Sequence, residues 1–264
     1  MNKITILGTG HATVTRCYNT CFALHTDSTL LLVDAGGGNG ILRQLKLASI
    51  AITDIHHLYV THAHTDHILG VVWIVRMVLS AKAYQGVCHI YSHAKGLQVI
   101  QTICQLTLSH RHQALMAERI AWHELHDGDR FEAGDIAMQC FDIHSAKELQ
   151  YGFRATLPGG TVVACLGDEP YQACERPYAE GAHWLMHEAF CLYAHHDHYR
   201  PYDKCHSTAL DAGRTAQELG VGHLVMYHTE DDHLDHRREL YTSEAAQAYH
   251  GPIYMPDDLD VITL

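Results

Sequence analysis

The sequence lacks several features that define large classes of proteins. No run of 18 apolar residues occurs in its 264 positions, so no membrane span is predicted. Its nine cysteines are odd in number and include no Cys-x-x-Cys pair, which argues against a zinc ribbon or a disulfide framework. Basic residues are also few. With 18 Lys and Arg against 30 Asp and Glu, the net charge is −12, which disfavours nonspecific binding to nucleic acid.

Signals for a domain boundary and for export are missing as well. No internal repeat, low-complexity linker or proline-rich break divides the chain. The first residues, MNKITILGTG, lead into a strand-like segment without a signal-peptide pattern, so we expect a cytoplasmic location. Because 47% of the residues are hydrophobic, the chain can bury a sizeable core. We therefore predict one domain over residues 1–264.

The hydrophobic pattern predicts strands and helices that alternate in the first and last parts of the chain, with a run of strands between them. The predicted strands cover residues 3–9, 21–26, 29–36, 55–62, 88–93, 119–125, 129–144, 151–157, 160–168, 183–190, 222–228, 252–256 and 259–264. The predicted helices cover residues 39–49, 68–84, 94–108, 207–220 and 237–250. This order favours an α/β domain with two sheets packed inside and helices outside.

One short segment concentrates potential metal ligands. The stretch VTHAHTDHIL places His62, His64, Asp66 and His67 within six positions. A chance match to this spacing is expected only about 0.015 times, even in a chain with so many histidines. Where the backbone is extended, His62 and His64 point the same way, and Asp66 and His67 enter the next turn. The segment can therefore serve two neighbouring metal ions, and its apolar flanks argue against a solvated loop.

Three further polar residues each close an apolar strand: His144, Asp168 and His228. Strand ends are a recurrent place for functional residues in layered α/β proteins. Any one of them alone would be an ordinary loop residue. With the histidine-rich segment they make an ordered series of four such strand ends, which indicates a metal site.

The motifs and their order resemble those of the metallo-β-lactamase superfamily, and most closely its ribonuclease Z and phosphodiesterase branch. The resemblance rests on GTGHATVTRCYNTCFAL, THAHTDH, HSAKELQYGFRATL, LGD, MHEAF, HSTALDAGRTAQELG and LVMYHTED, and it covers nearly the whole chain. Two details differ, since Tyr151 precedes Gly152 where the reverse order is usual, and Phe190 stands where Thr is usual. The resemblance implies a four-layer αβ/βα sandwich.

The resemblance also implies two metal ions with a shared ligand. It places one ion on His62, His64, His144 and Asp168. It places the other on Asp66, His67, Asp168 and His228, so that Asp168 bridges them. Mixed histidine and carboxylate ligands suit two zinc ions best, although manganese or iron is feasible. Such a pair of cations makes a hydroxide nucleophile available at neutral pH.

The predicted catalytic residues are Asp66, His206 and Glu188. Ser207 and Thr208 have the character of a helix N-cap, so His206 would lie where a helix directs its positive end at an anion. We expect His206 to stabilise or protonate the leaving oxygen, and the resemblance implies that Glu188 orients it. Asp34, which closes another apolar strand, is expected to steady a ligand histidine.

The sequence departs from the family members that process transfer RNA. They carry a long arm between the third histidine and the bridging aspartate, whereas only 24 positions separate His144 from Asp168 here. Together with the acidic charge, this disfavours full-length tRNA and favours a small phosphodiester, such as a cyclic nucleotide or a short RNA. A hydrolase of a lactam, lactone, thioester or sulfate ester is the alternative. A third hypothesis is a metal-holding regulatory protein without turnover.

The role of three segments is not decided by the sequence. Residues 194–198, AHHDH, are expected in a loop at the rim of the pocket, and residues 230–239 in a solvated charged segment before a helix. The region 93–123 contains an amphipathic stretch that could cover the pocket, form the face of a homodimer, or simply pack as a helix.

Overall fold

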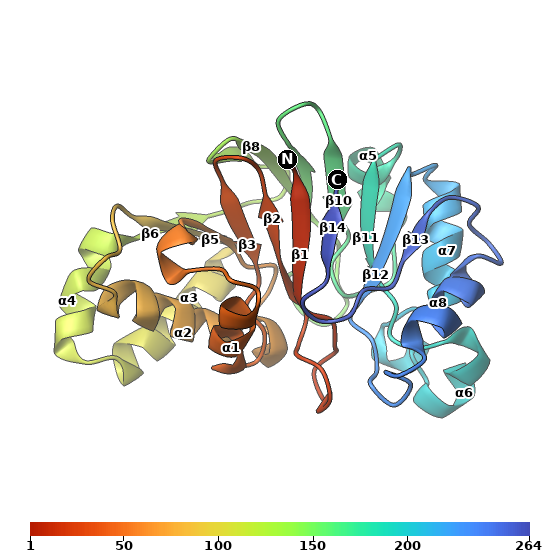
Figure 1. Ribbon diagram of the computed structural model, residues 1–264, viewed down its shortest axis with the longest axis horizontal. Coiled ribbons are helices and arrows are strands. Elements are labelled where there is room, and N and C mark those ends of the chain that lie inside the picture. The colour runs from red at the N-terminus through yellow and green to blue at the C-terminus, as the bar shows by residue number, and fades with distance from the viewer.

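The computed structural model describes residues 1–264, and two seven-stranded sheets face each other at its centre (Figure 1). The first sheet has the strand order β14-β1-β2-β3-β4-β5-β6. Strands β14, β1, β2 and β3 pair in antiparallel fashion, and β3 to β6 run parallel. The bounds are β1 Lys3–Gly8, β2 Cys21–His25, β3 Leu30–Val33, β4 His57–Tyr59, β5 Cys88–Ser92, β6 Ile120–Glu124 and β14 Val261–Thr263.

The second sheet has the corresponding arrangement, with the order β13-β12-β11-β10-β9-β8-β7. Its strands β10 to β13 run parallel, and β7 to β10 pair in antiparallel fashion. The bounds are β7 Arg130–Ala133, β8 Ile136–Asp142, β9 Tyr151–Thr156, β10 Val162–Cys165, β11 Trp184–Glu188, β12 His223–Tyr227 and β13 Ile253–Tyr254. The predicted β-meander is thus the antiparallel half of this sheet.

Helices cover the outer face of each sheet (Figure 1). On the first sheet these are α1 Gly40–Leu47, α2 Thr65–Ser80 and α3 Ala94–Thr107, with α4 His110–Arg119 beside them. On the second they are α5 Arg176–Ala179, α7 Ala209–Glu218 and α8 Arg237–Ala245. The short helices are α6 His196–Tyr199, η1 Ile52–Asp54, η2 Ala173–Glu175, η3 Tyr193–His195 and η4 Tyr202–Lys204.

Three hydrophobic cores hold these layers together. The inner faces of both sheets share one core, which includes Phe22, Tyr59 and Phe153. Alternate residues on each strand point outward and pack against the helices, as Leu58 does toward α2 and Leu224 toward α7. Helix, sheet, sheet and helix therefore form the predicted four-layer sandwich. Because strands from both ends of the chain, β1 and β14, pair in one sheet, we propose that residues 1–264 form a single domain.

No helix in the structure is both long and apolar enough to cross a lipid bilayer.

Two boundaries differ from the prediction around the histidine-rich segment. The expected strand 55–62 is shorter, since β4 ends at Tyr59, and the expected helix 68–84 begins earlier, at Thr65. His64 is the extended N-cap residue of α2, and Asp66 lies in its first turn, where a carboxylate is favoured by the helix dipole. The ligand-rich segment thus spans a strand-to-helix connection and not a strand end.

The region 93–123 contains two helices where the sequence predicts one. The first ends at Thr107, and Ser109 caps the second, because its hydroxyl accepts a hydrogen bond from the backbone N–H of His112. At the other end of α4, the Arg119 guanidinium donates to the backbone carbonyls of Val78 and Ala81, 3.0 Å from each. Figure 1 places α4 at the end of the molecule opposite α6. This placement favours the packing interpretation of the segment.

One buried carboxyl group makes stability depend on pH. Burial raises the pKa of Glu175 to about 9, and the neighbouring Glu169 adds to the shift. A folded pKa above the unfolded value of 4.5 means that this group's contribution to stability is complete below pH 4.5 and is lost as the pH rises toward 9. We expect Glu175→Gln to raise the free energy of unfolding at pH 8 by on the order of 3 kcal/mol.

Urea unfolding at pH 5 and pH 8 tests this expectation. A glutamine oxygen can still accept the bond that the backbone N–H of Gln172 donates to Glu175 at 2.9 Å, so the substitution changes little except the ionisation. The gain should be much smaller at pH 5. An equal gain at both values of pH would show that ionisation of Glu175 is not its cause.

Candidate metal centre

The predicted site residues lie where the parallel strands of the two sheets end. Asp34 follows β3, His62 and His64 follow β4, Asp168 follows β10, and His228 follows β12 directly. Because the carboxyl ends of parallel strands share one edge of a sheet, each sheet gathers its polar residues at one edge. The two sheets face each other, and these edges meet in one buried region.

The first group of potential ligands comprises His62, His64 and Asp168. His62 Nε2 lies 2.9 Å from His64 Nδ1 and 3.6 Å from Asp168 Oδ2. His62 and Asp168 are buried, and His64 is half-buried at the edge of the group. Burial holds the pKa of His62 well below its usual range, so this ring is neutral and its nitrogen is free to bind a cation.

The second group comprises Asp66, His67 and His228, all of them buried. Asp66 Oδ2 lies 3.4 Å from His67 Nε2 and 3.5 Å from His228 Nε2. Asp168 Oδ2 lies 3.5 Å from each of the same two nitrogens. Asp168 therefore faces both groups, which is the place of a bridging ligand.

The residues present fit a pair of divalent cations. The ring nitrogens His67 Nε2 and His228 Nε2 are buried and have no hydrogen-bond partner, although they face two carboxylates. Burial opposes ionisation of Asp66, but His67 and His228 outweigh it and hold the pKa of Asp66 far below its usual range. Imidazole nitrogens and ionised carboxylates at such spacing are the donor set of zinc and related metals.

Backbone geometry sets these residues apart from ordinary strand ends. Asp34, His144 and His228 adopt left-handed conformations, with φ of 54°, 56° and 58°. Such values are uncommon for residues other than glycine and concentrate at functional sites. The turn after β3 also needs Gly70 on α2, because a Cβ there would meet the backbone oxygen of Ala35 at 1.8 Å. This close approach brings α2, and with it His67, against the end of β3.

His144 does not join either group. Its ring is exposed and makes no hydrogen bond, while its backbone is held by Asp142 Oδ1 at 2.7 Å and Gln172 Nε2 at 3.3 Å. The residue follows the antiparallel strand β8, two positions beyond its end. The structure thus brings together six of the seven predicted ligands, and the assignment of His144 as the third histidine of the first ion stays a prediction.

Asp34 supports His67 as the sequence predicts. Its Oδ2 lies 2.8 Å from His67 Nδ1, and its two oxygens accept hydrogen bonds from the backbone N–H and the hydroxyl of Thr61, both at 2.8 Å. The Thr61 hydroxyl in turn lies 2.9 Å from His62 Nδ1. One buried carboxylate therefore orients ring nitrogens in both groups, leaving Nε2 of each ring for the cation.

We expect Asp34→Asn to weaken metal binding by about 10- to 100-fold, the usual cost of losing a carboxylate behind a ligand histidine. Competition with a chromogenic chelator measures the affinity. Asp135→Asn is a matched control, since Asp135 also accepts bonds from two hydroxyl groups but is exposed beside the β2–β3 turn. Equal affinities in wild type and Asp34→Asn would remove the supporting role of Asp34.

The predicted catalytic residues lie beside the second group. His206, Glu188 and His228 form a third buried cluster, and the rings of His206 and His228 are 5.3 Å apart. Thr208 caps α7 with the predicted side-chain bond, 3.3 Å from the backbone N–H of Asp211. Phe190 stacks on His206 with a centroid distance of 4.8 Å and an angle of 10°. The aromatic ring at this position thus fixes the plane of His206.

Glu188 binds the backbone on either side of His206 and makes no hydrogen bond to the His206 ring. Its Oε2 is 3.6 Å from His206 Nδ1, beyond hydrogen-bond distance. Its oxygens instead accept bonds from the backbone N–H of Ser207 at 2.5 Å, the Ser207 hydroxyl at 2.8 Å and the backbone N–H of Phe190 at 3.1 Å. The proposed orientation of His206 by Glu188 is therefore carried by the backbone on either side.

Three site residues were not predicted. His11 lies 4.6 Å from Phe190 and 6.3 Å from His228 between ring centroids, and burial together with His228 and His206 lowers its pKa to about 4. Lys147 Nζ lies 3.2 Å from His206 Nε2. Glu148 accepts a bond from the backbone N–H of Ala63 at 2.9 Å, inside the histidine-rich segment. All three lie in motifs on which the resemblance rests, His11 in the opening loop and Lys147 and Glu148 in the third-ligand segment.

Residues 194–198, predicted at the rim of the pocket, and residues 230–239, predicted as a solvated charged segment, contact each other, and the second also contacts the opening loop. The Arg16 guanidinium pairs with Asp235 at 2.8 Å and donates to the backbone carbonyl of Asp231 at 2.9 Å. The ring of His195 stacks on that of His233 at 4.6 Å. Residues 194–198 form η3 and α6 and not an open loop. These contacts join the opening loop and residues 194–198 to the segment 230–239.

The architecture and the ligand groups define a member of the metallo-β-lactamase superfamily, of its ribonuclease Z-like branch. The metallo-β-lactamase fold protein YhfI from Bacillus subtilis superposes with a TM-score of 0.80 over 100% of both chains, at 20% identity. Human tRNase Z, short form, gives a TM-score of 0.78 over 99% of this chain and 98% of that one, at 19% identity. In sequence, ribonuclease Z from Nostoc sp. is 26% identical over 86% of this chain and 83% of its own length.

Within that superfamily the chain belongs to the family described as anti-Pycsar protein Apyc1, whose model matches residues 2–208. The match covers the histidine-rich segment, Asp168 and the His-Ser-Thr start of α7. His228 lies beyond the matched range.

Proposed function

We propose that this protein is a binuclear metal-dependent hydrolase of a small phosphodiester, such as a cyclic nucleotide or a short oligoribonucleotide. The observation that carries the proposal is the place of His206 and Lys147 beside the two ligand groups. Lys147 Nζ and His206 Nε2 lie 3.2 Å apart, and His206 packs next to His228. Two nitrogen groups at this place suit an anionic phosphate, whose oxygens accept charge-assisted hydrogen bonds. Lys147 Nζ also lies 3.8 Å from Glu169 Oε1, and a phosphate would give it a second anionic partner that a neutral thioester does not offer.

The connection between the two halves of the site supports a small substrate. Strands β9 and β10 are joined by a tight turn, in which the backbone N–H of Leu157 donates to the carbonyl of Thr161 at 2.8 Å. The segment from His144 to Asp168 therefore forms a plain hairpin without a protruding arm. The net charge of −12 adds no basic surface for a long RNA backbone. Although related ribonuclease Z sequences are named for RNA cleavage, we do not propose full-length tRNA as the substrate.

We propose zinc as the metal, with manganese or iron as feasible alternatives. His62, His64 and Asp168 would hold one ion together with His144, and Asp66, His67, Asp168 and His228 the other. When bound, two such cations supply a hydroxide nucleophile at neutral pH and neutralise charge on the phosphoryl oxygens.

The side chains of the protein supply the remaining parts of the reaction. Asp66, kept ionised by its histidine neighbours, would hold the second ion and orient the attacking water as a hydrogen-bond acceptor. His206 faces the same region and is placed to give a proton to the leaving oxygen. Glu188 fixes the backbone of the His206 segment through Ser207. Lys147 is placed to bind a phosphate oxygen.

Hydrolysis of bis(p-nitrophenyl) phosphate by the zinc- or manganese-loaded protein tests the proposal. The same assay should then be run with cyclic nucleotides, short oligoribonucleotides and full-length tRNA. We expect turnover of the first two substrates and none of full-length tRNA. If the protein hydrolyses nitrocefin, a lactone, a thioester or a sulfate ester but no phosphodiester, the alternative hydrolase class is correct. Two bound metals without turnover of any of these substrates would support a metal-holding regulatory protein.

We expect Lys147→Met to lower kcat/KM for phosphodiesters by about 10- to 100-fold, because a hydrogen bond to a charged group is worth about 1.5–3 kcal/mol. Steady-state kinetics on bis(p-nitrophenyl) phosphate measure the change, and metal content should not alter. Lys82→Met, which removes an exposed lysine after α2, is the control. Unchanged kinetics in Lys147→Met would show that this side chain does not contact the substrate.

A further inference from the structure

One histidine beside the metal centre has no part in the reaction as described so far: His11, in the loop between β1 and β2. Its ring centroid lies 4.6 Å from that of Phe190 and 6.3 Å from that of His228. The ring of His206 packs against the same two rings. Two imidazoles from distant parts of the chain therefore border His228. His11 belongs to none of the groups of potential metal ligands.

The loop between β1 and β2, which projects below the sheets in Figure 1, holds His11 in place through its backbone. The backbone N–H of His11 donates to the carbonyl of Thr229 at 3.0 Å, and Asn19 Nδ2 donates to the carbonyl of His11 at 2.8 Å. The loop is also closely packed, because a Cβ on Gly10 would meet Val14 Cγ2 at 2.4 Å. The backbone of His11 is therefore fixed before a ligand binds, and it is fixed next to the residue that follows His228.

The side chain of His11 takes no part in these backbone contacts. The residue is half-buried, and its Nδ1 accepts one long hydrogen bond, 3.4 Å from the backbone N–H of Thr13. In a neutral ring whose Nδ1 is the acceptor, Nε2 carries the proton. Nε2 makes no hydrogen bond within the protein and is not a buried atom. The ring therefore presents one N–H donor to a ligand that enters from solvent.

The carboxylates near His11 are engaged elsewhere. The two whose charge acts on its ring are Asp231 and Asp66. Asp231 Oδ2 accepts hydrogen bonds from the backbone N–H groups of Thr15 at 2.7 Å and Arg16 at 2.6 Å. Asp66 belongs to the second group of potential metal ligands. Neither carboxylate bonds the ring of His11, so an acceptor for its Nε2–H has to come from outside the protein.

Building on the proposed function, we infer that His11 is a substrate-binding residue whose Nε2–H donates a hydrogen bond to a non-bridging phosphoryl oxygen. The loop between β1 and β2 thus adds a third nitrogen donor to those of His206 and Lys147. A charged phosphoryl oxygen is a stronger acceptor than a neutral carbonyl. A contact made equally in the bound substrate and in the transition state lowers KM and leaves kcat unchanged. Packing on Phe190 alone would need only an apolar side chain of similar size.

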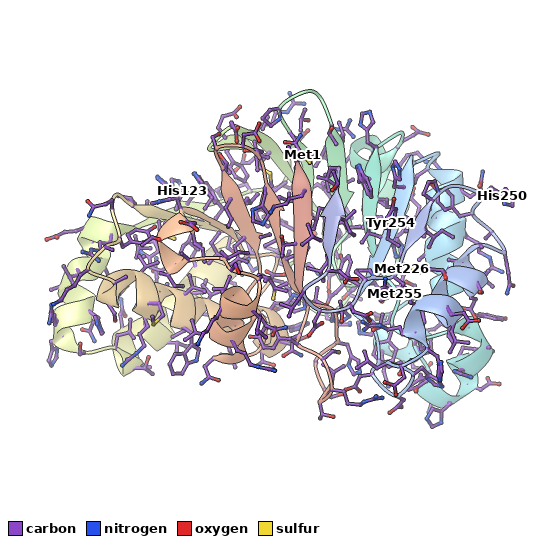
Figure 2. All side chains as sticks on the ribbon, viewed as in Figure 1. Met1, His123, Met226, His250, Tyr254 and Met255 are labelled. Atoms are coloured by element: carbon purple, nitrogen blue, oxygen red, sulfur yellow. The ribbon has the colours of Figure 1, made fainter.

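Calorimetric titration of the zinc-loaded protein with inorganic phosphate tests the contact without turnover. We expect His11→Leu, which keeps an apolar side chain against Phe190, to weaken phosphate binding at least about tenfold, the usual loss for a hydrogen bond to a charged group. His11→Gln, whose amide can donate near the position of Nε2, should restore most of the affinity. His250→Leu is the control, since His250 is exposed at the right-hand end of the molecule in Figure 2. All four proteins should contain equal amounts of zinc.

Steady-state kinetics on bis(p-nitrophenyl) phosphate separate this role from a structural one. His11→Leu should raise KM by a factor similar to the loss in phosphate affinity, with kcat nearly unchanged. Equal phosphate affinity in wild type and His11→Leu, a His11→Gln protein as weak as His11→Leu, or loss of zinc with the ring overturns the inference. Phosphate binding that depends on His11, in a protein that hydrolyses no phosphodiester, would support the contact and contradict the proposed function. Phosphodiester turnover with a KM that His11→Leu does not change would do the reverse.

Discussion

Asp168→Asn is expected to abolish the binding of a metal pair and to lower phosphodiester turnover by at least about a thousandfold, since a metal pair contributes several kcal/mol to the transition state. The reason is the position of Oδ2, which lies 3.6 Å from His62 Nε2 and 3.5 Å from both His67 Nε2 and His228 Nε2. No other carboxylate faces nitrogens of both groups at this distance. Removing its charge also leaves buried His62 Nε2 without a facing carboxylate.

Elemental analysis and kinetics on the same preparation measure both effects. Asp197→Asn is the control, because its side chain is 98% exposed on α6. A folded Asp168→Asn protein that still binds two equivalents of metal would show that the ions do not share this residue. Loss of one equivalent, with the other retained, would indicate that Asp168 belongs to a single ion and that the two groups act separately.

The fold could be predicted from the sequence because its signals are local and repeated. The apolar strands Leu30–Val33 and His223–Tyr227 are each followed directly by a polar residue, Asp34 or His228, and then by a helix or a turn of the expected kind. The ligand segment could be predicted for the same reason, since His62, His64, Asp66 and His67 are close in the chain. Their distribution between two groups agrees with the resemblance, which placed Asp168 between them.

The remaining parts of the site depend on contacts that no local pattern contains. Lys147 reaches His206 across 59 positions, and Glu148 contacts Ala63 across 85. His11 meets Phe190 only because the opening loop folds over β12. The helix boundary at Thr65 also follows from tertiary packing, because Gly70 lets α2 approach the backbone of Ala35. Such contacts are decided by how loops close over the sheets.

The position of Phe190 shows how one departure from the family motif changes the site. Where threonine is usual, the aromatic ring stacks on His206 and also receives Lys204, whose Nζ lies 5.0 Å from its centroid. A cation over an aromatic face is held by the ring quadrupole. Two lysines thus flank His206 in a protein of strongly acidic composition. These two lysines place positive charge beside His206, as the proposed anionic substrate requires.

His206→Ala is expected to lower turnover by about 100- to 10,000-fold, the usual contribution of a positioned acid or base, while both metal ions stay bound. His206 contacts His228 only through ring packing, with 5.3 Å between centroids, so its removal takes no ligand from the second group. Metal analysis of the variant tests that separation directly. If metal is lost with the side chain, His206 is a ligand and the role of proton donor must pass to another residue.

The dependence on the leaving group distinguishes protonation from simple positioning. A p-nitrophenolate leaves without a proton, whereas the alkoxide of a ribose needs one. If His206 donates that proton, His206→Ala should slow a ribose-type phosphodiester far more than bis(p-nitrophenyl) phosphate. A purely structural role, in which His206 only supports the packing of Phe190 and the start of α7, should slow both substrates equally. The same pair of substrates applied to Lys147→Met should show equal losses, because a phosphate-binding cation acts on both.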